Sequence, residues 1–162
     1  MLRKIVGIHM KENEEKVKKL GEILHYLTSK IPGLTRTQLV KLAYLIDRKY
    51  YVKHTFKMTS INYYMYFYGP YCDEFEPALN NLKSRNLIHE EFANGGYRIF
   101  FNQKIDYTLE VAEKEFIDTI IKFAKEKDLL LSAKKIKEYV YDLPEVLDAK
   151  PMESLNFDKA KT

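Results

Sequence analysis

The chain has 162 residues, which fits one domain better than two, and 46% of them are hydrophobic, enough to bury a sizeable core. Cys72 is the single cysteine, which excludes a disulfide within the chain and a cysteine-rich zinc site. The formal charge of +4 allows weak attraction to nucleic acid without requiring it. No apolar run is long enough to cross a bilayer, so we expect a cytoplasmic protein without a membrane partner.

Two amphipathic helices are expected in the first third of the chain. Apolar residues recur at steps of three and four over residues 14–30, and Pro32-Gly33 then stops the pattern. Thr35 offers an N-cap hydroxyl for a second helix, which reaches about Lys53. We expect residues 1–10, before the first pattern, to be flexible.

The middle of the chain combines extended segments with one helix. Residues 61–68 are rich in aromatic side chains and predict a strand, which Gly69-Pro70 ends sharply. Asp73 is the expected N-cap of a third helix. Residues 88–101 predict a β-hairpin because Asn94-Gly95-Gly96 lies at its centre.

The last third is expected to be helical again. A fourth helix is expected to start near Thr108 with Val111 facing inward, and Ser132 is the expected cap of a fifth helix. Pro144 is expected to end that helix, and residues 156–162 to be a frayed tail.

These elements predict an α+β fold that is mainly α-helical. It has about five helices and a small antiparallel β-sheet or hairpin between the second and fourth helices. Residues 11–155 form its single domain, because no linker or repeat divides them.

The sequence offers no pattern of an active site. Cys72 has no base placed near it by a motif, and the histidines His9, His25, His54 and His89 do not stand at metal-ligand spacing. We therefore expect a protein that is not an enzyme, with no catalytic residue, no metal and no cofactor.

A DNA-binding regulator is the alternative function. Helices followed by a third helix and a hairpin give the order of a winged helix-turn-helix, in which the start of the third helix enters the major groove. Here that start carries Asp73, Glu74 and Glu76, which would be repelled by phosphates. Specific nucleic-acid binding is therefore not expected.

The aromatic strand is the candidate partner-binding surface. Alternation places Ile61, Tyr63, Met65 and Phe67 on one face and Asn62, Tyr64, Tyr66 and Tyr68 on the other. The residue pattern favours burial of the first face, and the alternative is a strand that is core on both sides. Tyrosine, phenylalanine and methionine are enriched at protein interfaces. The candidate surface residues are Tyr64, Met65, Phe67 and Tyr71.

Two stretches carry a family resemblance. Residues 41–47, KLAYLID, are followed by YFYGPY at 66–71 and by LKSRNLI at 82–88. A second patch is VYDLPE at 140–145 with Ala149-Lys150-Pro151. Together they resemble the Panacea domain, the SocA-like antitoxin and phage-associated family, over about two thirds of the chain, although Tyr66 replaces the tryptophan that many relatives carry. The family-motif residues are Lys41, Leu42, Tyr44, Tyr66, Tyr68, Gly69, Pro70 and Pro144.

The resemblance implies a compact helical domain from bacteria, archaea or their phages that acts in a toxin-antitoxin system. It implies neutralisation of a toxin, or of a neighbouring gene product, by direct protein binding without catalysis. It also suggests that Tyr66 and Tyr68 are structural, which would bury the opposite face of the strand. The two interpretations of the strand stay open at this point.

Overall fold

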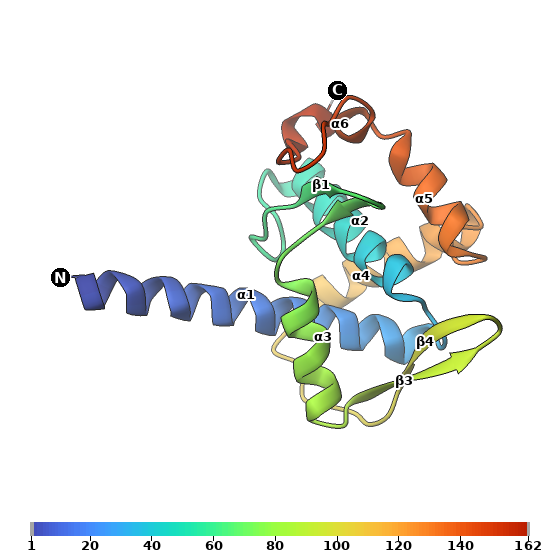
Figure 1. Ribbon diagram of the computed structural model, residues 1–162, viewed down its shortest axis with the longest axis horizontal. Coiled ribbons are helices and arrows are strands. Elements are labelled where there is room, and N and C mark those ends of the chain that lie inside the picture. Colours follow the sequence, from blue (N-terminus) through green and yellow to red (C-terminus); the bar gives the residue numbers. More distant parts are fainter. Residues whose placement is uncertain (1, 162) are drawn as a thin grey trace.

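The computed structural model describes residues 2–161 and has a mainly helical α+β fold (Figure 1). Its helices are α1 (Leu2–Lys30), α2 (Arg36–His54), α3 (Phe75–Ser84), α4 (Val111–Glu126), α5 (Ala133–Tyr141), α6 (Pro144–Leu147) and the 3-10 helix η1 (Phe157–Lys161). Its strands are β1 (Tyr64–Tyr66), β2 (Gly69–Tyr71), β3 (Ile88–Ala93) and β4 (Gly96–Phe101). They pair as two separate antiparallel hairpins, β1–β2 and β3–β4. The expected fold class is confirmed.

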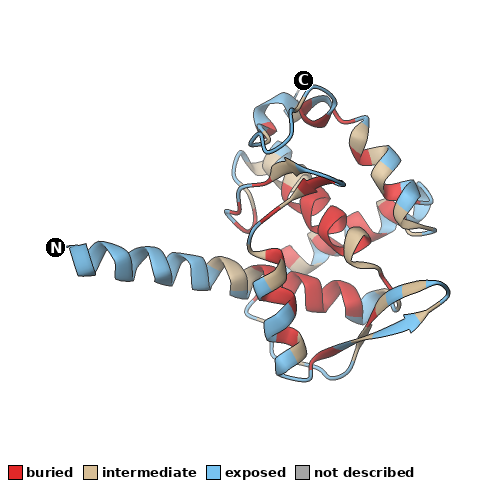
Figure 2. Cartoon of the chain, in the orientation of Figure 1, coloured by how far each residue is buried: buried red, intermediate tan, exposed pale blue. Residues whose placement is uncertain are grey.

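Helix α2 is the centre of the fold. Every residue from Gln38 to Asp47 is buried, and the other elements surround this stretch (Figure 2). Helices α1, α4 and α5 pack against it, as do strand β2 and η1. Such a helix cannot show a clean amphipathic stripe, because it is covered on all sides.

Short-range signals in the sequence fix several element boundaries as expected. The Thr35 hydroxyl accepts from the Gln38 amide at 3.1 Å, and the Gln38 side chain accepts from the Thr35 amide at 2.9 Å, which completes a capping box. Ser132 caps α5 by accepting from the Lys135 amide. Asn94 and Gly95 both have positive φ, as the tight turn between β3 and β4 requires.

Two expected helix starts are wrong. Glu74 is the N-cap residue of α3, while Asp73 instead accepts from the Tyr64 hydroxyl at 2.8 Å. Helix α4 starts after Glu110, and Thr108 donates its hydroxyl to the buried Glu22. In both places the polar side chain expected to cap the helix forms a hydrogen bond with a residue of another element instead.

Two further expectations on the last third are corrected. Val111 is 71% exposed, whereas Glu113, two residues further along the first turn of α4, is buried and paired with Lys19. Pro144 begins α6 at its first position, where the missing amide hydrogen costs nothing, instead of simply ending the helix before it.

The two ends of the described chain are more regular than expected. Residues 2–10 belong to α1, which projects from the body as a single helix (Figure 1). In the tail, Phe157 is buried and its ring lies 5.3 Å from that of Tyr44, so η1 is held against α2.

Candidate partner-binding surface

The aromatic segment forms a hairpin and not one long strand. Tyr64 pairs with Tyr71, Met65 with Pro70, and Tyr66 with Gly69. The Gly-Pro pair therefore begins β2, where the sequence predicted the end of a single strand over residues 61–68. The turn of this hairpin holds Phe67, with Tyr66 before it and Tyr68 after it; we call these three residues the aromatic turn.

Gly69 and Lys41 hold the aromatic turn in place. Gly69 has a φ of 97°, a region that favours glycine, and a Cβ there would lie 3.2 Å from Lys41 Cε. The Lys41 ammonium donates to the Pro70 carbonyl oxygen at 2.9 Å. Burial, together with the nearby charge of Lys137, lowers the pKa of Lys41 to about 8. One buried side chain on α2 thus supports the β2 backbone directly.

Aromatic contacts fix the direction in which the turn projects. The Tyr66 ring stacks on Tyr71 at a centroid distance of 5.4 Å and contacts Phe67 at 4.8 Å. The Lys137 ammonium lies over the Tyr68 ring at 5.3 Å. A small cavity of about 160 Å³ lies beside these rings and is lined by Lys41 and Tyr71, among others.

The aromatic turn is open to solvent. Phe67 is 81% exposed, Tyr68 65% and Tyr66 40%. Isolated exposed apolar residues are ordinary, but three consecutive aromatic residues on a braced turn form a patch. Large rings that are held in place lose little side-chain entropy when a partner covers them.

The backbone of this hairpin is already paired on its outer side. The Met65 amide donates to the Glu153 carbonyl, and the Met152 amide donates to the Met65 carbonyl at 2.7 Å. The Leu155 amide donates to the Tyr63 carbonyl in the same way. Strand β1 therefore offers no free edge to a partner's strand, and recognition by this hairpin would use side chains.

The expected alternation of faces holds for only half of the segment. Ile61 and Tyr63 are buried as expected, but Phe67 points into solvent because the chain turns at this residue. Of the candidate surface residues, Tyr64, Met65 and Tyr71 are half-buried and Phe67 is exposed. Tyr66 and Tyr68 are exposed, as the residue pattern favoured, but they were not among the candidate surface residues. The hairpin turn itself was missed, although an aromatic run before Gly-Pro could have indicated it.

Contacts join the two separate motif patches in space. Tyr44 on α2 donates its hydroxyl to Glu145 at 2.7 Å, and Arg48 donates to the same carboxylate. Glu145 is buried directly after Pro144, the first residue of α6. Leu42 is fully buried beside Lys41. These hydrogen bonds join α2 to α6.

Reactive side chains elsewhere are enclosed or scattered. Cys72 is fully buried, and burial raises the pKa of its thiol well above the usual value. Within residues 2–161, no three His, Cys, Asp or Glu side chains gather as a possible metal site. In the same part of the chain, no helix has the length and apolar character needed to span a membrane.

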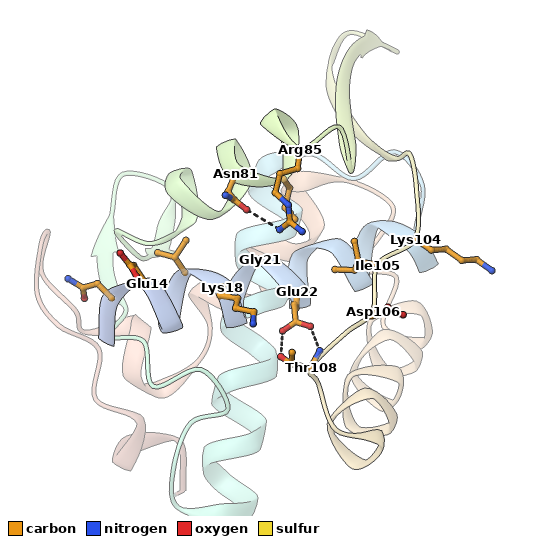
Figure 3. Close-up of a pocket in the computed structure, with 13 residues that line it drawn as sticks. Glu14, Lys18, Gly21, Glu22, Asn81, Arg85, Lys104, Ile105, Asp106 and Thr108 are labelled. Carbon is orange, nitrogen blue, oxygen red and sulfur yellow. Dashed lines mark hydrogen bonds between the residues drawn. The ribbon is translucent and has the colours of Figure 1, made fainter. Parts of the chain in front are cut away.

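A larger open groove lies on another side of the molecule. It has a volume of about 900 Å³ and is bounded by α1, by the end of α3 and by residues 104–108 (Figure 3). Its walls carry both acidic and basic side chains, such as Glu14, Asp106 and Arg85. This mixture selects no small molecule of one charge.

The region that would read DNA in a winged helix is occupied by internal ion pairs. Arg36 donates to Glu76 at 2.9 Å and to Glu90 at 2.6 Å. The acidic start of α3 is thus tied to α2 and β3. Within the part of the chain that the structure describes, these ion pairs lend no support to the DNA-binding alternative.

A protein-family model matches residues 39–145, well over half of the chain; its description is "Antitoxin SocA-like, Panacea domain". The matched range contains the aromatic turn, Lys41 and Glu145. No curated protein and no solved structure matches the chain.

Proposed function

Since the chain belongs to the family of SocA-like antitoxins with a Panacea domain, we propose that it neutralises a protein toxin by binding it directly. The contact surface of this proposal is the aromatic turn. The observation that carries it is the exposure of Phe67, at 81%, on a backbone that Lys41 and Gly69 hold rigidly. A rigid exposed ring is the usual anchor of a binding hot spot.

The braced turn would bind by insertion into an apolar pocket of the toxin. Phe67 would enter the pocket, because its ring protrudes furthest into solvent. Tyr66 and Tyr68 would flank it and place their hydroxyls at the rim, where tyrosine is common in interfaces. Because the stacked Tyr66–Tyr71 pair is formed in the free protein, little ordering remains to be done on binding.

The proposed mechanism needs no catalysis. Neutralisation would follow from occupation of the toxin's surface at a stoichiometry of one to one, without a cofactor. Cys72, the natural candidate for a nucleophile, is enclosed in the core and has a raised pKa, which suits a packing role.

The test uses the products of the two reading frames that adjoin this gene, each co-purified with the full chain. Phe67→Lys should weaken binding to the cognate product by more than about 2 kcal/mol, a hot-spot-sized loss. It should leave the melting temperature unchanged, because the side chain contacts solvent in the free protein. Growth rescue on co-expression should fall in parallel.

Phe92→Lys is the matched control. Phe92 is 69% exposed at the tip of the other hairpin and also sits on an edge-to-face pair, with Tyr97. It should bind like the unmodified chain. Equal losses in the two variants, or full binding by Phe67→Lys, would contradict the proposed surface.

A further inference from the structure

The small cavity of about 160 Å³ beside the aromatic turn has a buried cation in its wall. Lys41 lines this cavity together with Gly69, Tyr71 and two rings of the aromatic turn. Lys41 is buried almost completely, and lysine rarely reaches this degree of burial unless an acid is paired with it. Within residues 2–161 the ammonium has one hydrogen-bond acceptor, the Pro70 carbonyl oxygen. Because an ammonium has three donors, two of them remain for a ligand.

The acidic side chains near the cavity are already neutralised. Glu76, the one carboxylate among the residues that line it, accepts from Arg36 at 2.9 Å. Arg36 also donates to Glu90, which accepts from Lys83 at 2.8 Å. These two cations and two anions balance one another, so none of this negative charge is left over for the Lys41 ammonium.

Two further groups act on the Lys41 ammonium, and neither is an anion at neutral pH. Lys137 on α5 is a second cation, whose charge helps to lower the pKa of Lys41. Cys72 is fully buried, and its raised pKa keeps the thiol neutral. The cavity therefore holds positive charge that the described residues do not compensate.

A ligand can approach this charge past the aromatic turn. Tyr66 and Tyr68 line the cavity and are both exposed. Between them and the ammonium, Gly69 has no side chain; a Cβ there would lie 3.6 Å from Lys41 Nζ. The volume of about 160 Å³ corresponds to roughly five water molecules, which is room for a carboxylate and a short apolar stem. One buried ammonium with aromatic walls suits a single negative charge better than a phosphate dianion.

We propose that this cavity binds a carboxylate group, with the Lys41 ammonium as its counter-ion and the tyrosine rings around the atoms next to the carboxylate. The group belongs either to a free small acid or to an acidic side chain or chain end of a bound protein. The inference stands apart from the proposed toxin binding, because a free acid is enough to test it.

Titration of the full chain with acetate at constant ionic strength tests the site. The probe is the Cε resonance of Lys41 in NMR spectra of lysine-labelled protein, assigned by its loss in Lys41→Met. Acetate should shift this resonance with a dissociation constant on the order of 10 mM, as befits so small a ligand. Acetamide has the same shape without the charge and should bind at least about tenfold more weakly.

The pH dependence of acetate binding separates Lys41 from lysines on the surface. Affinity should fall by at least about tenfold between about pH 7 and about pH 9.5, because Lys41 loses its charge above a pKa of about 8. Exposed lysines, with a pKa of about 10.4, stay charged over this range, so acetate bound to them would not be released.

Lys49→Met is the matched control for Lys41→Met. Lys49 lies on the same helix, and burial lowers its pKa too, but its ammonium lies over the Phe123 ring at 3.6 Å and not in the cavity. Lys41→Met should weaken acetate binding, followed at the Tyr71 ring, by at least about tenfold. Lys49→Met should change it by less than about threefold, since distant sites act independently.

Competition identifies the source of the carboxylate. If a toxin supplies it, acetate should weaken binding of the cognate neighbouring gene product, whereas acetamide should not. If the ligand is a free acid, both should leave that binding unchanged. Equal binding of acetate and acetamide, acetate affinity that is constant up to about pH 9.5, or equal effects of Lys41→Met and Lys49→Met would each overturn the proposal. The first two results come from the native chain, so they decide the question even if Lys41→Met does not fold.

Discussion

Replacing Lys41 by methionine should remove a pH dependence of stability that the native chain has between about pH 8 and pH 10.5. Lys41 is only 2% exposed, and burial lowers its pKa in the folded state from 10.5 to about 8. The unfolded chain keeps the ordinary value. Between these two values the unfolded state binds more protons than the folded state, so stability rises with pH.

The size of the effect follows from the two pKa values. Their difference, from 10.5 to about 8, corresponds to about 3 kcal/mol at full separation, since each pH unit is worth about 1.4 kcal/mol. This contribution is complete above pH 10.5 and is lost as the pH falls through 8. Methionine has a side chain of similar length but cannot donate to the Pro70 carbonyl. Loss of this hydrogen bond should lower the stability of Lys41→Met by about 1 to 3 kcal/mol, an amount that does not vary with pH.

Urea unfolding at a series of pH values measures both quantities. The native chain should gain stability relative to Lys41→Met as the pH rises across the stated window. Tyrosines titrate in both proteins, so their effect on stability cancels in the comparison. Lys125→Met, at an exposed position on α4, should show no such slope difference. Parallel curves for the native chain and Lys41→Met would refute the burial argument, because Lys41 would then titrate equally in both states.

Two further predictions concern carboxylates that accept internal hydrogen bonds. Asp47→Ala should lower the free energy of unfolding in urea by about 3 kcal/mol. Asp47 accepts from the Thr59 amide at 3.0 Å and from the Tyr63 hydroxyl at 2.9 Å, and both donors would lose their partner. A loss under about 1 kcal/mol would mean that water replaces the Asp47 carboxylate as their acceptor. The pKa of Glu90 is lowered to about 2, first by its hydrogen bonds from Arg36. Its contribution to stability is therefore lost as the pH falls from 4.5 toward 2. When stability is measured over this acid range, Glu90→Gln should lack that part of the decline.

Local sequence signals predicted those elements that are decided within a few residues. The Thr35 cap needs only Gln38 three positions on, and the Asn94-Gly95 turn needs only two positive φ values. Both are determined by short-range geometry that the sequence displays directly. The same holds for the cap at Ser132.

Misjudged elements depend on partners that are distant in sequence. The Thr108 hydroxyl donates to Glu22, and Asp73 accepts from the Tyr64 hydroxyl, so neither side chain caps the helix that follows it. The chain reversal at Phe67 was missed for a related reason: strict alternation along one strand buries Phe67, but the structure forms a hairpin whose second strand is held by Lys41 on α2. Spacing along a strand cannot reveal a lysine in a preceding helix.

The hydrogen bonds on the outer side of β1 determine when, during synthesis, this strand becomes fully paired. Residues 152–155 are synthesised about 90 residues after Tyr63 and Met65, which they pair with, so this contact forms long after β1 has been made. Until then, β1 presents an unpaired edge beside exposed aromatic rings, a combination that invites aggregation. A nascent chain is therefore vulnerable until residues 152–155 have been synthesised, and the aromatic turn gains its full bracing only when this segment has folded back onto β1.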